Sequence, residues 1–160
     1  MPTKAHAQSI IKNLSASGET VSVAESLTGG GLGHALTQIP GASQVFIGGI
    51  VAYTEDVKVN LLGVPHTLID QFTVVSEEVA VAMANGALEK FGTTWAISTT
   101  GIAGPGDYLG IREGTVWIAI AGPINQTLQL TLDSGRDGVR QGAISSAIGN
   151  FARILSYRTN

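Results

Sequence analysis

Hydrophobic residues recur along the chain with two different periods, which separate the expected helices from the expected strands. Near the C-terminus an apolar stripe from Ile144 to Leu155 advances in steps of three and four residues, the spacing of one face of a helix. Between positions 128 and 132 three leucines instead alternate with polar residues. This second pattern predicts a half-exposed antiparallel strand.

The same periodicity, with capping and turn residues, divides the whole chain into elements. Helices are predicted over residues 3–17, 32–39, 54–62, 76–91 and 136–157, and strands over residues 20–25, 45–53, 94–100, 115–121 and 127–132. Ser76 is the expected N-cap of the clearest helix. The strand VFIGGIVAY at 45–53 is expected to be buried, and its paired glycines indicate a bulge or a close approach.

These elements predict one α/β domain over residues 1–160. Helices that alternate with strands favour a three-layer α/β/α sandwich around a mixed, mainly parallel five-stranded sheet.

Composition narrows the possible functions. Hydrophobic residues make up 44% of the chain and charged residues only 13%, which excludes a disordered protein. The net charge of −3 and the lack of a basic block argue against a nucleic-acid surface. Apolar runs reach about eight residues, far below the ~20 that span a bilayer, so we expect a cytoplasmic protein without membrane contact. So little charge on a soluble chain also favours a homodimer or a larger homo-oligomer.

The absence of cysteine excludes disulfides, thiolate metal sites and a cysteine nucleophile. The three histidines, His6, His34 and His66, are scattered and lack metal-ligand spacing. We therefore expect neither a metal nor another cofactor.

The junction after the first strand carries the first candidate chemistry. Ser26, Thr28, Gly29 and Gly30 stand at the end of a strand and the start of a helix, where ligands bind in open α/β sheets. Ser26 is a candidate nucleophile, and helix-start amides at Thr28 to Gly30 are candidate oxyanion donors. The alternative is structural: Ser26 or Thr28 merely caps the helix.

A serine nucleophile needs a base, and a buried lysine can supply one. Lys58 follows the second strand, five residues after Tyr53. Both side chains could face the same crevice as Ser26. The alternative is an exposed Lys58 paired with Glu55 or Asp56.

Two arginines open the last helix, where the helix dipole disfavours cations. Arg140 is also in line with the buried stripe, since Ile144 lies four residues further on. Either a substrate phosphate or an ion pair with Asp133 or Asp137 would explain it. Arg136 lies in the same first turns.

The loop that begins at Gly101 is rich in glycine and follows Thr99 and Thr100 at the end of the third strand. Thr100 and Gly101 could form a wall of the same pocket. The alternative is a simple connector.

Several segments in this order resemble one family, the CinA C-terminal domain family. They are AESLTGG at 24–30, PGAS at 40–43 with Phe46, VAYTEDVKVNLLGV at 51–64, VSEEVA at 75–80, GIAGP at 101–105, GTVWIA at 114–119 and GRDGVR at 135–140. The resemblance covers nearly the whole chain and implies a three-layer fold with a mixed sheet. Stand-alone members of the family include nicotinamide mononucleotide deamidases, which recycle pyridine nucleotides.

The resemblance implies roles for individual residues. Ser26 matches the presumed nucleophile, Lys58 the presumed base, Tyr53 a supporting residue and Arg140 an arginine associated with activity. The implied reaction hydrolyses the carboxamide of nicotinamide mononucleotide to nicotinic acid mononucleotide and ammonia, without metal or organic cofactor, and Arg140 would hold the substrate phosphate.

This sequence departs from the family pattern in the loop at 106–113 and at the pair before Gly101, which is Thr99-Thr100 where serine is commoner. Residues 106–113 are shorter than in many members and lack the Lys-Pro pair that often precedes the Gly-Thr-Val strand. A non-catalytic nucleotide-binding or regulatory protein that kept the pocket is therefore an alternative to an enzyme.

Overall fold

The computed structural model describes residues 2–158. Its helices are α1 (Pro2–Ser17), α2 (Gly31–Thr37), α3 (Glu55–Leu62), α4 (His66–Phe72), α5 (Glu77–Phe91) and α6 (Gly135–Arg158), with a 3₁₀ turn at Ala42–Gln44. Its strands are β1 (Val21–Glu25), β2 (Phe46–Val51), β3 (Trp95–Gly101), β4 (Thr115–Ala121) and β5 (Gln126–Thr131).

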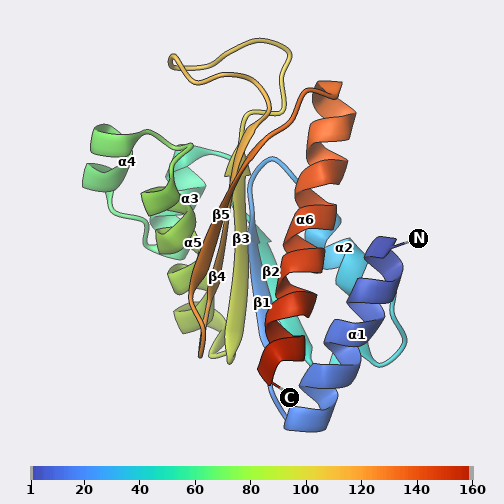
Figure 1. Ribbon diagram of the computed structural model, residues 1–160. Coiled ribbons are helices and arrows are strands. Elements are labelled where there is room, and N and C mark those ends of the chain that lie inside the picture. The colour runs from blue at the N-terminus through green and yellow to red at the C-terminus, as the bar shows by residue number, and fades with distance from the viewer. Residues whose placement is uncertain (1, 159–160) are drawn as a thin grey trace.

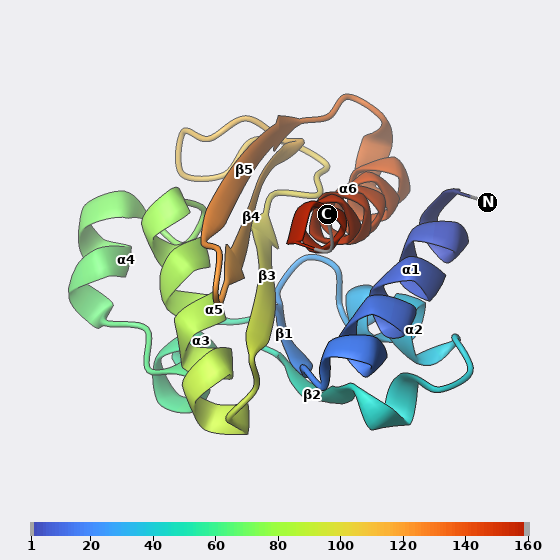
Figure 2. The ribbon, with the colours of Figure 1, turned by 60° about the horizontal axis from the view of Figure 1, so that its bottom comes forward.

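The five strands form one mixed sheet in the order β2-β1-β3-β4-β5. β1 pairs in parallel with β2 and β3, whereas β4 pairs antiparallel with β3 and β5. Four strands therefore run in one direction, although parallel and antiparallel pairings are equal in number. Helices α1, α2 and α6 cover one face and α3, α4 and α5 the other (Figures 1 and 2). The predicted three-layer α/β/α fold is confirmed.

The core lies in two layers, one on each side of the sheet. Between the sheet and α1 and α6, Trp95 and Phe151 meet edge to face with ring centroids 5.3 Å apart. On the other side α5 packs through Met83 and small residues such as Ala87. Gly86 allows α5 to approach α3, because a Cβ there would lie 2.0 Å from the Leu62 carbonyl oxygen.

The structure differs from the predicted elements at β2, where the prediction was wrong, and at α4, for which none was made. The strand β2 is not buried but lies at the edge of the sheet, where Ile47 and Val51 are about half exposed, at 51% and 48%. Helix α4 was not predicted, because its seven residues after Pro65 bury only Ile69 and so show no helical stripe.

The paired glycines of β2 behave as their pattern indicated. The pairing register of β1 and β2 shifts next to Val21, and a Cβ on Gly49 would lie 2.4 Å from Val23. The two strands thus approach closely only because this position is glycine.

The fold brings three strand ends together. β1, β2 and β3 are parallel, and Glu25 and Val51, the last residues of β1 and β2, lie level with Thr99 near the end of β3. The loop at 102–114 projects from the same edge (Figure 1). Residues that follow these strands therefore share one crevice.

Candidate active site

Ser26 and Lys58 contact one another at the strand ends. The Lys58 Nζ donates to Ser26 Oγ at 2.9 Å, to the Ala52 carbonyl at 2.8 Å and to the Tyr53 carbonyl at 3.3 Å. Both side chains are buried, with Lys58 only 2% exposed. The structure thus rejects the exposed Lys58 that the sequence left open.

Local backbone contacts hold the two side chains in place. The Ser26 N–H donates to the Thr99 carbonyl at 3.0 Å, which anchors the nucleophile candidate to β3. On the other side, the Thr54 hydroxyl accepts the Val57 N–H and begins α3, which carries Lys58 inward.

Burial lowers the pKa of Lys58 from 10.5 to about 8, and the nearby Glu55 carboxylate partly opposes this shift. A neutral amine keeps two N–H donors and one lone pair. The carbonyls of Ala52 and Tyr53 take the two donors, which leaves the lone pair for the Ser26 hydroxyl. This arrangement suits a lysine base that activates a serine.

The pair opens onto a cavity of about 850 Å³. It is lined by Ser26, Leu27, Tyr53, Thr54, Glu55, Lys58, Ile69, Asp70, Thr73, Val74, Val75, Thr100 to Leu109 and Arg136. Thr100 and Gly101 belong to this wall, as their place at the end of the third strand suggested. The volume falls in the range of small-molecule sites.

The residues at the start of α2 do not line this cavity. The Thr28 hydroxyl is fully buried and donates to Glu25 at 2.6 Å, so it does not cap the helix. The Glu25 carboxylate instead accepts the N–H groups of Leu32 at 2.8 Å and Gly33 at 3.0 Å. A carboxylate already occupies the helix start, so the expected anion site over Thr28 to Gly30 is not available there.

Arg140 also lies outside the cavity lining. Its Nε donates to the Leu27 carbonyl at 2.9 Å and its Nη2 to the Thr28 carbonyl at 3.4 Å. Within residues 2–158 it forms no ion pair with Asp133 or Asp137. Gly29 lies beside this guanidinium and has a φ of 58°, a left-handed conformation that favours glycine.

Arg136 takes the place at the cavity that the sequence analysis gave to Arg140. Its guanidinium donates to the Gly104 carbonyl at 2.7 Å and to the Tyr53 hydroxyl at 3.3 Å. It is exposed and retains free donors. Tyr53 is 57% exposed and joins the same wall.

Sequence reasoning missed Glu25 as part of the site. The available signal was a charged residue at the end of a strand that is otherwise apolar except for Ser22, directly before the nucleophile candidate.

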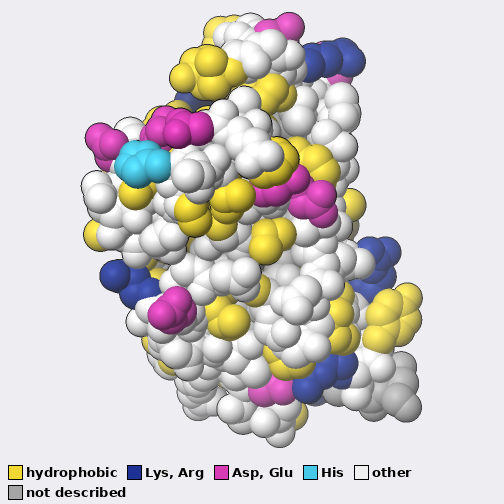
Figure 3. All heavy atoms as spheres, turned by 90° about the vertical axis from the view of Figure 1, so that its left-hand side faces the viewer, with side chains coloured by type: hydrophobic (Ala, Val, Ile, Leu, Met, Phe, Trp, Pro, Cys, Tyr) yellow, Lys and Arg dark blue, Asp and Glu magenta, His cyan; other side chains and the backbone are white. Residues whose placement is uncertain are grey.

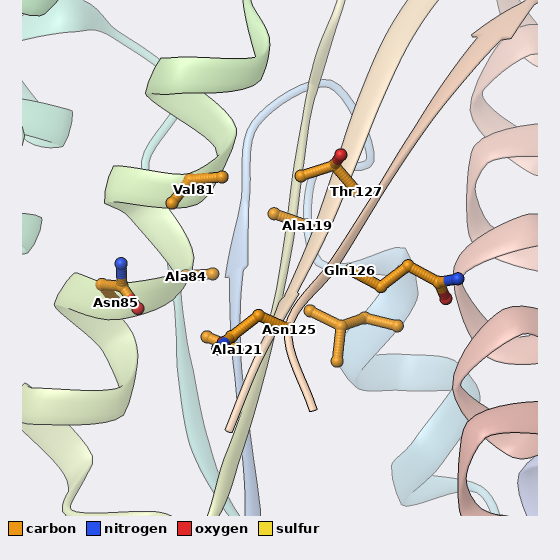
Figure 4. Close-up of a pocket in the computed structure, with 9 residues that line it drawn as sticks. Val81, Ala84, Asn85, Ala119, Ala121, Asn125, Gln126 and Thr127 are labelled. Carbon is orange, nitrogen blue, oxygen red and sulfur yellow. The ribbon is translucent and has the colours of Figure 1, made fainter. Parts of the chain in front are cut away.

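A second hollow lies between α5 and the strands β4 and β5 (Figure 4). It measures about 410 Å³ and is lined by Val81, Ala84, Asn85, Ala119, Ile120, Ala121, Asn125, Gln126 and Thr127. None of the lining side chains is ionisable, so the lining of this hollow has no base of the kind that Lys58 supplies beside Ser26.

Residues 2–158 contain no group of His, Asp and Glu side chains placed to hold a metal ion. None of the helices described is both long and apolar enough to cross a bilayer.

Comparison with known families gives one match across most of the chain. The model of the CinA C-terminal domain matches residues 3–155. A CinA-like protein of Gloeothece citriformis is 55% identical over 142 residues, which are 86% of this chain and 34% of that protein. A CinA-like protein of Parasynechococcus marenigrum is 44% identical over 150 residues, 91% of this chain and 36% of that protein. The chain thus spans about a third of the length of these relatives.

Solved structures agree with the family model. The competence/damage inducible protein CihA of Agrobacterium tumefaciens superposes with a TM-score of 0.92 at 34% identity and covers 98% of this chain and 96% of its own. A CinA superfamily protein of Escherichia coli gives a TM-score of 0.92 at 28% identity, over 95% of this chain and 90% of that one.

Proposed function

Because the chain belongs to the CinA C-terminal domain family, we propose that it is an amidohydrolase that converts nicotinamide mononucleotide to nicotinic acid mononucleotide and ammonia. The observation that carries the proposal is the buried contact of 2.9 Å between Lys58 Nζ and Ser26 Oγ at the cavity wall. A nucleophile within hydrogen-bond reach of a base with a lowered pKa is the arrangement that acyl transfer needs.

The first half-reaction forms an acyl-enzyme. Neutral Lys58 takes the proton of the Ser26 hydroxyl while Oγ attacks the carboxamide carbon. The C–N bond then breaks, and the proton on Lys58 passes to the leaving nitrogen, which departs as ammonia. Ser26 is left as an ester of nicotinic acid mononucleotide.

The second half-reaction reverses these roles with water. Lys58 takes a proton from water as the oxygen attacks the ester carbon. The bond to Ser26 Oγ breaks, and the proton returns to Oγ. The product is the free acid, and Lys58 is again neutral.

The oxyanion of each tetrahedral intermediate needs a backbone donor. The Leu27 N–H directly follows the nucleophile, at a residue that lines the cavity, and it donates to no acceptor in the described part of the chain. We assign it as one donor in place of the helix start, where the Glu25 carboxylate would repel the oxyanion.

The phosphate of the substrate needs a cation within the cavity. Lys58 serves as base, and Glu55, Asp70 and Asp107 make other parts of the wall acidic. Arg136 is the exposed cation of the lining and has guanidinium donors to spare. We therefore place the phosphate at Arg136 and not at Arg140.

The experiment compares ammonia release from nicotinamide mononucleotide, its riboside and free nicotinamide. The wild type should favour the mononucleotide, and Arg136→Ala should lose about ten- to a hundredfold in kcat/KM on that substrate alone. Nicotinic acid mononucleotide must appear in step with ammonia. A wild-type protein that releases no ammonia from any of the three would favour the nucleotide-binding alternative.

The enzyme would act on a soluble mononucleotide in the cytoplasm, as a homodimer or a larger homo-oligomer. The face that carries α3, α4 and α5 shows several separate hydrophobic side chains among charged ones (Figure 3). Leu61, Phe72 and Val81 on these helices are exposed. Light scattering that gives 16.5 kDa over a wide concentration range would contradict an oligomer.

A further inference from the structure

The strongest feature that the proposed mechanism does not use is the buried carboxylate of Glu25. It is 2% exposed, and no cation among residues 2–158 pairs with it. Its oxygens accept the Thr28 hydroxyl and the N–H groups of Leu32 and Gly33. A buried charge without a counter-ion is costly unless such donors compensate it.

Glu25 is linked to both halves of the Ser26–Lys58 pair. Its side chain holds Thr28, two residues after Ser26. Its own carbonyl accepts the Ala52 N–H at 2.7 Å, and the Ala52 carbonyl in turn accepts Lys58 Nζ.

The hydroxyl contacts around Glu25 have a fixed direction. Thr28 has one hydroxyl proton, and it goes to the carboxylate at 2.6 Å. In the contact of 2.8 Å between the hydroxyls of Thr28 and Thr99, Thr99 must therefore be the donor. Because the Thr99 carbonyl also holds the Ser26 N–H, the turn after β1 is anchored on both sides of the nucleophile.

We propose that Glu25 is a positioning residue, whose carboxylate fixes the turn at Ser26 through Thr28 and the first amides of α2 and so keeps Ser26 Oγ within reach of Lys58. The inference rests on the proposed function. The competing explanation is that Glu25 only stabilises the fold as the cap of α2.

Two substitutions separate these explanations. In Glu25→Gln one side-chain NH₂ faces a backbone N–H or the Thr28 proton, so a donor meets a donor and the turn must shift. Thr28→Val is nearly isosteric and removes only the hydroxyl, while Thr28→Ser keeps it. A misplacement of a reacting group by about 1 Å can lower the reaction rate about a hundredfold. We therefore expect Glu25→Gln and Thr28→Val, the two disruptive variants, to slow the reaction of Ser26 by about ten- to a hundredfold.

The matched control is Ser76→Ala. Ser76 caps α5 by accepting the Val79 N–H at 3.2 Å, but it has no contact with the turn at Ser26. This variant should melt about 2–4 °C lower without any change in the reactivity of Ser26.

The test measures the rate at which a fluorophosphonate labels Ser26, followed by mass spectrometry, together with the melting temperature of each variant. Labelling should slow in Glu25→Gln and Thr28→Val, recover in Thr28→Ser and stay unchanged in Ser76→Ala. Thr28→Val covers the case in which Glu25→Gln fails to fold.

The outcomes distinguish failure of this inference from failure of the proposed function. If the two disruptive variants are labelled at the wild-type rate but melt at lower temperatures, Glu25 acts only as the cap of α2, and the inference is overturned. If the fluorophosphonate does not label the wild type, the protein has no activated Ser26 to position, and the inference is overturned as well. A wild type that is labelled but releases no ammonia from nicotinamide mononucleotide would refute the substrate and leave the positioning role intact.

Discussion

Substitution of Glu55 should move the pH dependence of the reaction downward. Its carboxylate favours the charged form of Lys58, against the burial that lowers the pKa to about 8. In Glu55→Gln this opposition disappears, so the pKa of Lys58 should fall further. The reaction needs neutral Lys58, so kcat/KM rises with pH through the pKa of Lys58, and this rising limb should move to lower pH.

The size of the effect follows from the fraction of neutral lysine. A lysine of pKa about 8 is about one tenth neutral at pH 7, whereas a lysine at the ordinary value of 10.5 is neutral in roughly one molecule of 3,000. Burial thus supplies about 300-fold more base at neutral pH. Glu55→Gln can raise kcat/KM at pH 7 by at most about tenfold, because full deprotonation is the ceiling.

The assay is ammonia release from nicotinamide mononucleotide between pH 6.5 and 10, above the second phosphate pKa of about 6. Titration of Lys58 by NMR in the free protein gives the same pKa without substrate. Asp56→Asn is the matched control, since it removes the same charge one residue further on and Asp56 does not shift Lys58. An unchanged or higher apparent pKa in Glu55→Gln, or an equal shift in Asp56→Asn, would refute the reasoning.

Two other predictions concern the dyad and the stability of the fold. Lys58→Ala should lose most of the deamidase activity. The double variant with Ser26→Ala should be little less active than either single variant, because nucleophile and base act as a unit. A double variant whose loss in kcat equals the product of the two single losses would contradict this. At the other end of the sheet Glu19 accepts hydrogen bonds from Trp95 at 2.7 Å and Arg158 at 2.8 Å, and the Arg158 contact keeps the pKa of Glu19 below its usual value. The ionised Glu19 carboxylate therefore stabilises the fold at pH values above its pKa in the unfolded chain, and this stability is lost as the pH falls through its lowered pKa in the folded protein. Glu19→Gln should melt about 2–4 °C lower than the wild type at pH 7 but at the same temperature near pH 2. An equal deficit in melting temperature at both pH values would exclude the ionised carboxylate as the cause.

Much of the fold follows from local patterns. The helices α1, α5 and α6 carry clear caps or apolar stripes, and their predicted limits lie within one residue of those observed. The edge position of β2 could not be predicted, because an apolar run of this kind fits a buried strand and an incompletely covered edge strand equally well. Which of the two it becomes depends on the sheet order, which is a long-range property.

The candidate site was predictable where chain order alone brings residues together. Ser26 and Lys58 each follow a parallel strand, and such strand ends meet at one edge. The roles of the two arginines were not predictable in this way. Arg136 and Arg140 share the start of α6, and only the packing of that helix against the turn at Leu27 decides which one reaches the cavity.

The most direct test of the account is ammonia release from nicotinamide mononucleotide by the wild type and Ser26→Ala, prepared in parallel and matched in melting temperature. We expect sustained release by the wild type and loss of most of this activity in the variant, whose cavity keeps Arg136 and Lys58. Ammonia release by Ser26→Ala near the wild-type rate would contradict a covalent reaction through Ser26.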